Sequence, residues 1–243
     1  MKKDINKIMS RMRRAVERYS MIEKGDVIGV GVSGGKDSLV LLSALAEMRA
    51  FADFDYDVIA VTVDNGLAFG DVADFSRITE LCQALNVRHE IVKTEISKIV
   101  FDIRQEKNPC SLCASLRRGA LTSTARELGC TSVALGHHLD DAAETYMMNI
   151  ILAGRAGCFA PVAHYEESGL KLIRPMIYLR ESEVSGFAAK AELPVMAKTC
   201  PLDGETEREH FKILLREEDK RHRGVYKRIL GALERSAVDG WHE

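Results

Sequence analysis

The sequence of 243 residues predicts an α/β fold, a doubly wound parallel sheet of five strands with helical extensions at its N- and C-terminal ends. Short apolar runs rich in β-branched residues alternate with helix-like segments, which is typical of a parallel sheet covered on both faces. Polar clusters follow several of these runs, at the strand ends where such sheets bind ligands. A hydrophobic content of 46% and a charged content of 29% are those of a globular protein.

The expected elements follow one another with short connections. Residues 5–19 are basic and amphipathic and are predicted as a helix. The expected strands are the apolar runs 27–32, 56–63, 87–92, 131–135 and 170–174, with a further short strand at 194–196. The expected helices are 37–50, 71–85, 111–128 with Gly129 as its stop, a helix ending near 152, 180–191, and 205–235 with a break near Gly224. Residues 94–109 are less regular.

Charge and hydropathy limit the classes of function. A net charge of −2 argues against indiscriminate binding to nucleic acid, but residues 1–24 carry eight Lys or Arg against three acids, and residues 220–228 carry five and no acid. Either end is suited to gripping phosphates, and a solvated helix face explains each one equally well. No apolar run approaches membrane-spanning length and the N-terminus lacks the apolar core of a secretory signal, so we expect a cytoplasmic protein with no membrane partner.

Residues 33–38 (SGGKDS) lie between the first expected strand and a helix. Such a turn offers unpaired backbone N–H groups and the positive end of a helix dipole to a phosphate, and glycine lets the main chain approach the anion closely. Asp37 is a candidate Mg²⁺ ligand, or only a favourable acid in the first helical turn. The Walker A pattern fails because Asp37 replaces its metal-binding hydroxyl. The glycines of a dinucleotide fingerprint are present, but Gly29 and Gly31 fall inside the expected strand.

A second polar cluster, residues 136–141 (GHHLDD), closes the fourth expected strand. Two adjacent carboxylates at the start of a helix suit a metal ion, or one of them caps the helix. His138 is a candidate contact for a phosphate or an adenylated substrate. Alone the string is a weak indication, but its expected position one strand away from the first cluster strengthens it.

The third cluster is a cysteine pair. Of six cysteines, Cys82 and Cys130 are expected in the core, and Cys110 and Cys113 form a C-x-x-C motif. In a cytoplasmic chain of this size the pair is consistent with redox chemistry, structural zinc or an iron–sulfur cluster. Cys200 is the only later free-standing candidate for a third ligand, and three thiolates would leave one coordination position open.

Together these segments resemble the PP-loop ATP pyrophosphatases, and among them the tRNA 2-thiocytidine synthetase family, over about residues 12–200. The matching segments are 21–26 (MIEKGD), 33–38 (SGGKDS), 110–113 (CSLC) with 116–119 (LRRG), 134–141 (ALGHHLDD) and 173–175 (IRP). The resemblance implies the adenine nucleotide alpha-hydrolase type of fold. It implies a basic N-terminal helix (1–24), a PP-loop ATPase domain with a cysteine cluster (25–200) and a helical C-terminal tail (201–243).

The resemblance also implies cofactors and residue roles. ATP would be bound by Ser33, Gly34, Gly35, Lys36, Asp37, Ser38, Val63, Asp64, Gly136 and His138. Asp37 and Asp141 would hold Mg²⁺, and Cys110, Cys113 and Cys200 would hold an iron–sulfur cluster of the 4Fe–4S type with one open iron. Asp37, Asp141 and Arg117 would be catalytic, with Arg117 or its neighbour Arg118 directing positive charge into the cleft.

The implied activity is ATP-dependent 2-thiolation of a cytidine in a tRNA anticodon loop, through an adenylated base, release of pyrophosphate and attack by sulfide. Its partners would be tRNA, a sulfur donor (a cysteine desulfurase or sulfide) and a second copy of the chain in a homodimer. A ligase resembling lysidine synthetase is an alternative, but it needs no cysteine cluster. A non-catalytic adenine-nucleotide sensor would not need the paired acids, and a dinucleotide oxidoreductase is the weakest alternative.

Overall fold

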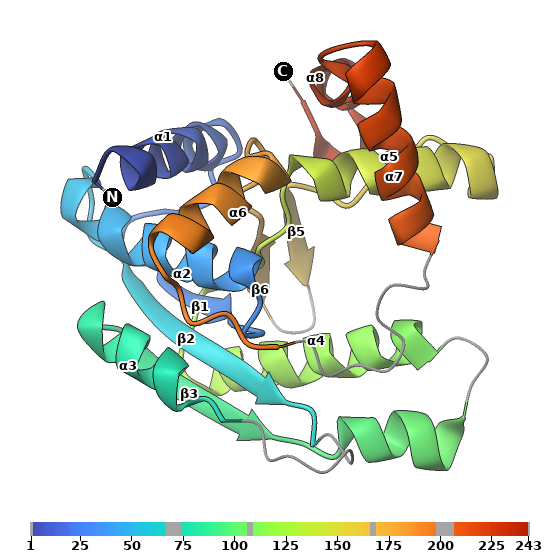
Figure 1. Ribbon diagram of the computed structural model, residues 1–243. Coiled ribbons are helices and arrows are strands. Elements are labelled where there is room, and N and C mark those ends of the chain that lie inside the picture. The colour runs from blue at the N-terminus through green and yellow to red at the C-terminus, as the bar shows by residue number, and fades with distance from the viewer. Residues whose placement is uncertain (1, 67–73, 106–108, 166–168, 198–206, 243) are drawn as a thin grey trace.

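The structure is a computed structural model that describes residues 2–66, 74–105, 109–165, 169–197 and 207–242. In this described part, six strands form one sheet in the order β3-β2-β1-β4-β6-β5 (Figure 1). The strands are β1 (Val27–Gly31), β2 (Asp57–Asp64), β3 (Arg88–Lys93), β4 (Ser132–Ala134), β5 (Val162–Tyr165) and β6 (Leu170–Ile173). All neighbours are parallel except β5, which is antiparallel to β6. The predicted α/β fold is therefore confirmed, with one strand more than the five expected.

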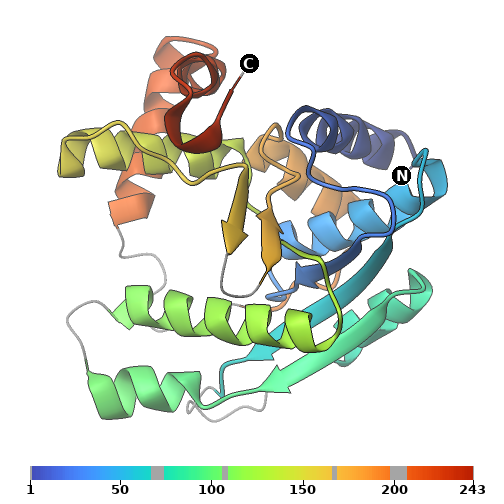
Figure 2. The same cartoon turned by 180° about the vertical axis from the view of Figure 1, so that it is seen from behind.

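Helices cover both faces of the sheet. The helices are α1 (Lys2–Arg18), α2 (Lys36–Met48), α3 (Ser76–Ala84), α4 (Pro109–Glu127), α5 (Leu139–Ala153), α6 (Glu181–Lys190), α7 (Glu207–Arg221) and α8 (Val225–Arg235), with short helical segments at Arg49–Phe51, Lys98–Arg104 and Val238–Gly240. Side chains of α1, α2, α3 and α6 share one apolar core with β1 and β2. Helix α4 packs on the opposite face, where it lies in front of the sheet when the molecule is seen from behind (Figure 2).

Two glycines inside β1 explain how α4 lies so close to the sheet. A Cβ added at Gly29 would lie 3.2 Å from Cys130 Sγ, and one added at Gly31 would lie 2.8 Å from Leu121 Cδ2 of α4. Both glycines lie inside the strand, as the sequence predicted, and the structure shows that they allow close packing of neighbouring side chains. The winding of the chain reverses between β3 and β4, so β1 and β4 are neighbours and Val30 pairs with Ala134.

Some expected elements need correction. Strand β5 was missed because its four residues show no apolar alternation, and it is held by pairing with β6. The expected strand at 194–196 is wrong, because this segment pairs with no strand among the described residues. Its Met196 N instead donates to Gly34 O at 3.0 Å. The irregular stretch 94–109 contains a π-helix, Lys98–Arg104. The break near Gly224 is confirmed, and this glycine has φ +92° between α7 and α8.

The C-terminal segment of the described chain packs against the end of α1, on the side away from the α4 face. Trp241 is fully buried, and its ring centroid lies 6.2 Å from that of Tyr19 at the end of α1. Helices α7 and α8 pack across α5, where Leu215 and Tyr226 bury against Leu139 and Ala143. In the described part of the chain, every helix is too short or too polar to span a lipid bilayer.

Candidate active site

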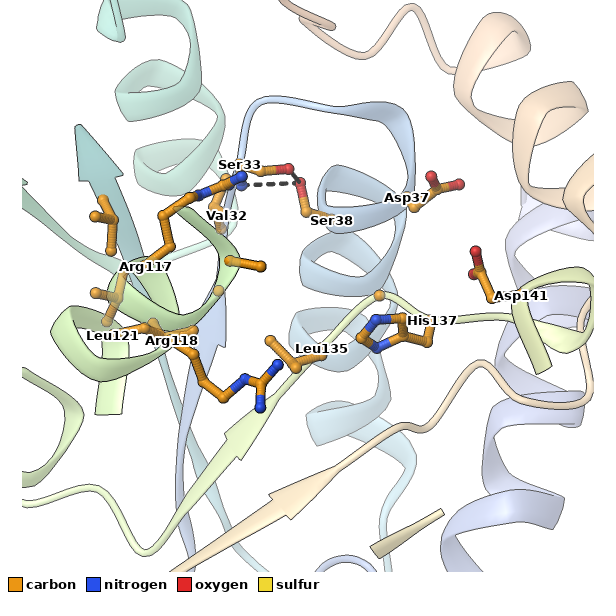
Figure 3. Close-up of a pocket in the computed structure, with 15 residues that line it drawn as sticks. Val32, Ser33, Asp37, Ser38, Arg117, Arg118, Leu121, Leu135, His137 and Asp141 are labelled. Atoms are coloured by element: carbon orange, nitrogen blue, oxygen red, sulfur yellow. Dashed lines mark hydrogen bonds between the residues drawn. The ribbon is translucent and has the colours of Figure 1, made fainter. Parts of the chain in front are cut away.

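A cavity of about 350 Å³ opens at the carboxyl ends of β1, β2 and β4 (Figure 3). Its walls come from the turn after β1, the end of β2, one face of α4 and the segment after β4. The lining residues are Gly31, Val32, Ser33, Asp37, Ser38, Val61, Val63, Ala114, Arg117, Arg118, Leu121, Leu135, Gly136, His137 and Asp141. The cavity thus lies at the topological switch point, where open α/β sheets bind their ligands.

The turn after β1 has the geometry of an anion cradle. Gly34 has φ +80°, a left-handed conformation that favours glycine, and Gly35 is the N-cap of α2 without a side-chain cap. The first N–H groups of α2 are therefore left for a ligand. Ser38 Oγ donates to Gly35 O at 2.9 Å and accepts from Ser33 N at 3.1 Å, so the two serines shape the turn from within.

The two polar motifs touch through Gly136. A Cβ at this position would lie 3.0 Å from the carbonyl carbon of Asp37 and 3.2 Å from Ser38 N. Only a hydrogen in place of a side chain allows the segment after β4 to rest directly on the start of α2. This contact brings Asp141 beside Asp37, and the Asp141 carboxylate points toward Asp37 (Figure 3).

The ring of His138 lies next to both of these carboxylates. Its buried ring lies with Nδ1 3.2 Å from Asp141 Oδ2 and Nε2 3.8 Å from Asp37 Oδ1. His138 N donates to Asp141 Oδ2 at 2.8 Å, which makes Asp141 part of the N-terminal capping box of α5. His138 is not among the residues that line the cavity, and its ring supports the two acids.

The two acids fit a hard divalent cation. Asp37 Oδ1 is buried and accepts no hydrogen bond in the described structure, although Lys36 Nζ lies 3.1 Å away. Among the described residues, no three His, Cys, Asp or Glu side chains make a ready-made metal site. A Mg²⁺ ion held by Asp37 and Asp141 would therefore complete its shell with water and substrate phosphate oxygens, which is its usual preference.

Lys36 belongs to a charged cluster that sequence reasoning missed. Its Nζ lies 3.3 Å from Glu181 Oε1, and the same carboxylate accepts from Lys212 Nζ at 2.8 Å and Arg216 Nη2 at 2.9 Å, both on α7. Burial raises the pKa of Glu181, but Lys212 and Lys36 outweigh it and lower the pKa to about 2. Burial lowers the pKa of Lys36, but Asp37 and Glu181 together raise it above its ordinary value. No local motif at the start of α6 signals this role for Glu181.

The two carboxylates of the GHHLDD segment do different work. Asp140 is buried, accepts from Arg180 Nε at 3.1 Å and from Glu181 N at 2.8 Å, and so ties α5 to the start of α6. One turn later Glu144 is buried, and burial together with Asp141 raises its pKa to about 8. Arg208 of α7 lies 3.6 Å from Glu144 Oε2 and 3.4 Å from Asp141 Oδ1.

The cysteine pair lies at the beginning of α4. Cys110 is exposed and Cys113 half-buried, and Arg117 follows Cys113 by one helical turn. Since residues three and four apart share a helix face, the thiols and Arg117 lie on one side of α4. Ala114, next to Cys113, lines the cavity, as Arg117 does. The expected third ligand, Cys200, lies outside the described residues.

The remaining cysteines are packing residues in this structure. Cys82 and Cys130 are buried, as expected from the sequence, and burial raises the pKa of Cys82 to about 11. Cys158 donates to Ala142 O at 3.5 Å, and burial raises its pKa to about 12. A thiol with so high a pKa is a poor metal ligand or nucleophile at neutral pH.

The ATP-site and catalytic residues expected from the sequence lie in and around the cavity. Those that line the cavity are Ser33, Asp37, Ser38, Val63, Arg117, Gly136 and Asp141. Gly34, Gly35 and Lys36 form the adjoining turn, and His138 lies behind the acids. Asp64 ends β2, and its Oδ1 accepts from Gly66 N at 3.0 Å.

His137 lines the cavity and was missed, because nothing in two adjacent histidines shows which one faces it. Its Nδ1 is buried without a hydrogen-bond partner in the described structure, and burial, followed by the charge of Arg174, lowers its pKa to about 4. Burial also lowers the pKa of Arg174 to about 10, and the charge of Arg118 acts in the same direction.

Known proteins are similar to this chain over most of its length. A tRNA-cytidine(32) 2-sulfurtransferase of Geobacter sulfurreducens is 37% identical over 233 residues, which are 93% of this chain and 88% of that protein. The protein of the same name from Sorangium cellulosum is 37% identical, over 93% of this chain and 80% of its own. The U34-tRNA thiolase NcsA of Methanococcus maripaludis, solved with its [4Fe-4S] cluster, has a TM-score of 0.78 and 26% identity, covering 94% of this chain and 77% of that one. Residues 5–210 match the family described as PP-loop domain. This chain belongs to the PP-loop domain family, as the sequence resemblance predicted.

Proposed function

We propose that this protein is an ATP-dependent tRNA sulfurtransferase that 2-thiolates a cytidine. One observation carries the proposal: the phosphate-binding turn, the paired acids and the C-x-x-C helix meet at one cavity. The relatives named for cytidine 32 support that nucleotide as the target. A lysidine synthetase-like ligase would share the first two features and would not require the cysteines.

ATP binding follows from the shape of the site. The β and γ phosphates would rest on the backbone N–H groups of Gly34, Gly35 and the start of α2, with Lys36 beside them. Val61 and Val63 at the end of β2 offer an apolar wall for adenine. Asp37 and Asp141 would hold Mg²⁺, and the ion when bound would offset the charge on the departing pyrophosphate.

The base carbonyl oxygen would attack the α-phosphorus, and the bond to the β-phosphate would break with release of pyrophosphate. Arg117 lines the same cavity and would stabilise the negative charge that develops on the α-phosphate oxygens. The adenylated carbon then accepts sulfide, and AMP leaves with the former carbonyl oxygen. An anticodon loop suits this chemistry because its bases are unstacked at low cost.

The accessible thiols Cys110 and Cys113 would ligate the iron–sulfur cluster together with Cys200. Met196, four residues before Cys200, donates a hydrogen bond to Gly34 O of the phosphate-binding turn. A cluster with one iron free of protein ligands would supply the sulfide when bound. The sulfur donor, a cysteine desulfurase or sulfide itself, stays a prediction from the sequence.

A homodimer and a cytoplasmic location are further parts of the proposal. An exposed apolar group at the end of α5 supports the dimer, because such surfaces are commonly buried between copies of a chain. Its members are Ile150, Ile151 and Leu152, with 40%, 54% and 58% of their surface exposed.

The test uses anaerobically reconstituted protein with ATP, a sulfide source and cytidine-containing tRNA. We expect AMP and pyrophosphate in step with 2-thiocytidine, measured by nucleoside mass spectrometry. Asp37→Asn should abolish both, whereas Asp53→Asn, an exposed carboxylate outside the cavity, should leave both unchanged. Release of ADP and orthophosphate, or AMP formation with an amine in place of sulfur in the product, would contradict the proposal.

A further inference from the structure

Three planar side chains form a column at the edge of the cavity. The rings of His137 and Phe159 have centroids 5.0 Å apart with an interplanar angle of 37°. The guanidinium carbon of Arg174 lies 4.8 Å from the centroid of the same Phe159 ring. These residues come from three places in the chain, the segment after β4, the loop before β5 and the end of β6. The column is therefore a product of the tertiary fold.

The column carries polar atoms without partners. In the described structure His137 Nδ1 and Arg174 Nε are both buried and make no hydrogen bond. Leaving such atoms unpaired costs stability, and because His137 lines the cavity, its unpaired ring nitrogen there points to a ligand. His137 itself lines the cavity, as does Arg118, whose charge acts on Arg174.

The loop that carries Phe159 is held in place by the C-terminal segment. Trp241 Nε1 donates to Phe159 O at 2.9 Å, and Cys158 N donates to Asp239 Oδ2 at 2.7 Å. Arg174 Nη1 donates to Ala160 O at 2.5 Å. The backbone on both sides of Phe159 is thus anchored, which is typical of a preorganised binding surface.

The column and the proposed adenine position lie in different parts of the site. In the proposed function adenine lies against Val61 and Val63 of β2. Figure 3 places Arg117 and Leu121 on one side of the cavity and His137 with Asp141 on the other. The α-phosphate, bound between them, would therefore have the His137 side open to an incoming nucleophile.

We propose that the His137–Phe159–Arg174 column is the platform on which the target nucleobase of the RNA stacks. The inference rests on the proposed function and names the subsite for its RNA substrate. A pyrimidine ring placed on His137 would continue the column and bring its carbonyl oxygen toward the α-phosphate. The base would lie against the face of the His137 ring, and Arg118, which lines the cavity, would face a neighbouring backbone phosphate.

The test compares Phe159→Leu with a matched substitution at an exposed phenylalanine outside the cavity, Phe51→Leu. We expect the KM for tRNA to rise by up to roughly tenfold in Phe159→Leu, because His137 loses the ring that holds it for stacking on the base, and the KM for ATP to stay within about twofold. Phe159→Tyr keeps the ring and should restore the wild-type value. Phe51→Leu should change neither constant.

A second readout does not depend on turnover. An anticodon stem–loop with the fluorescent base pyrrolocytosine at position 32 should be quenched on binding to wild-type protein and to Phe159→Tyr, and far less by folded Phe159→Leu. Equal quenching by all variants would overturn the platform. An equal rise in the KM for ATP would also overturn it, because the column would then belong to the ATP site. If wild type quenches the probe but forms no thiolated product, the platform holds and the proposed reaction fails.

Discussion

Replacing Gly136 with alanine is a sharp test of how the two polar motifs are brought together. Gly136 has no positive φ, so alanine adds no backbone strain and the effect comes from contact alone. The new Cβ would lie 3.0 and 3.1 Å from the carbonyl carbon and oxygen of Asp37, which are backbone atoms and cannot rotate away. The segment after β4 and the start of α2 must therefore separate by a few tenths of an ångström.

The substitution should lower both the stability of the protein and its catalytic rate. Overpacking of this kind costs about 1–3 kcal/mol of unfolding free energy, which for a chain of this size lowers Tm by roughly 2–12 °C. The larger effect is on catalysis, because Asp37 and Asp141 move apart. A displacement of about 1 Å can cost about 100-fold in rate, so we expect tRNA-dependent pyrophosphate release to fall by roughly 10- to 100-fold.

The assay is pyrophosphate release at saturating tRNA, with thermal unfolding in parallel. Gly186→Ala is the matched control, since nothing lies within 4 Å of a Cβ at that helical position. It should raise stability by about 0.5–1 kcal/mol and leave the rate unchanged. A Gly136→Ala protein with wild-type pyrophosphate release would refute the view that this contact sets the distance between the acids.

Three further changes are predicted from the charged groups and the thiols. Glu181→Gln removes one of the two carboxylates beside Lys36, so the KM for ATP should rise about tenfold in steady-state kinetics, and an unchanged KM would count against Glu181 as a positioning residue. The folded protein keeps Glu144 protonated up to about pH 8, whereas the unfolded chain releases that proton near pH 4.5. This contribution to stability is complete below about pH 4.5 and is lost as pH rises through about 8. Between about pH 5 and pH 9 the unfolding free energy of wild type should therefore fall more than that of Glu144→Gln, and the difference between the two falls should reach up to roughly 5 kcal/mol. Denaturant titrations with EDTA measure both, and parallel curves would disprove the assigned pKa. Cys113→Ala should abolish visible absorbance at about 400 nm in anaerobically purified protein, whereas Cys158→Ala should keep it. A colourless wild-type protein with bound zinc would contradict the iron–sulfur cluster.

Local sequence was sufficient where one short segment contains the whole signal. Strands β1 and β2 are rich in β-branched residues, and the turn after β1 needs only two glycines between a strand and a helix. The strands and the turn are present, and Gly29 and Gly31 lie inside β1 as expected. Strand β5 shows the limit, because four residues hold a strand only through pairing with β6.

The roles of individual side chains were harder to predict from the sequence. Adjacent residues on a helix or loop point in different directions, so the local pattern did not distinguish Asp140 from Asp141, and only the family resemblance favoured Asp141. In the structure Asp140 binds Arg180 and Asp141 lines the cavity. The same holds for the neighbouring histidines 137 and 138, of which the less expected one faces the ligand space. Direction is decided by packing against elements far away in the chain.

The sequence by itself determined the α/β fold, the family and the candidate residues for phosphate, metal and sulfur, because the signal for each lies within short segments of the chain. Only the tertiary structure decided that Glu181 joins Lys36 to α7, that Gly136 brings the two acids together, and that His137, Phe159 and Arg174 form a column. These arrangements join residues from separate elements. Their geometry is set by how the helices and loops pack on the sheet, which no local pattern of residues encodes.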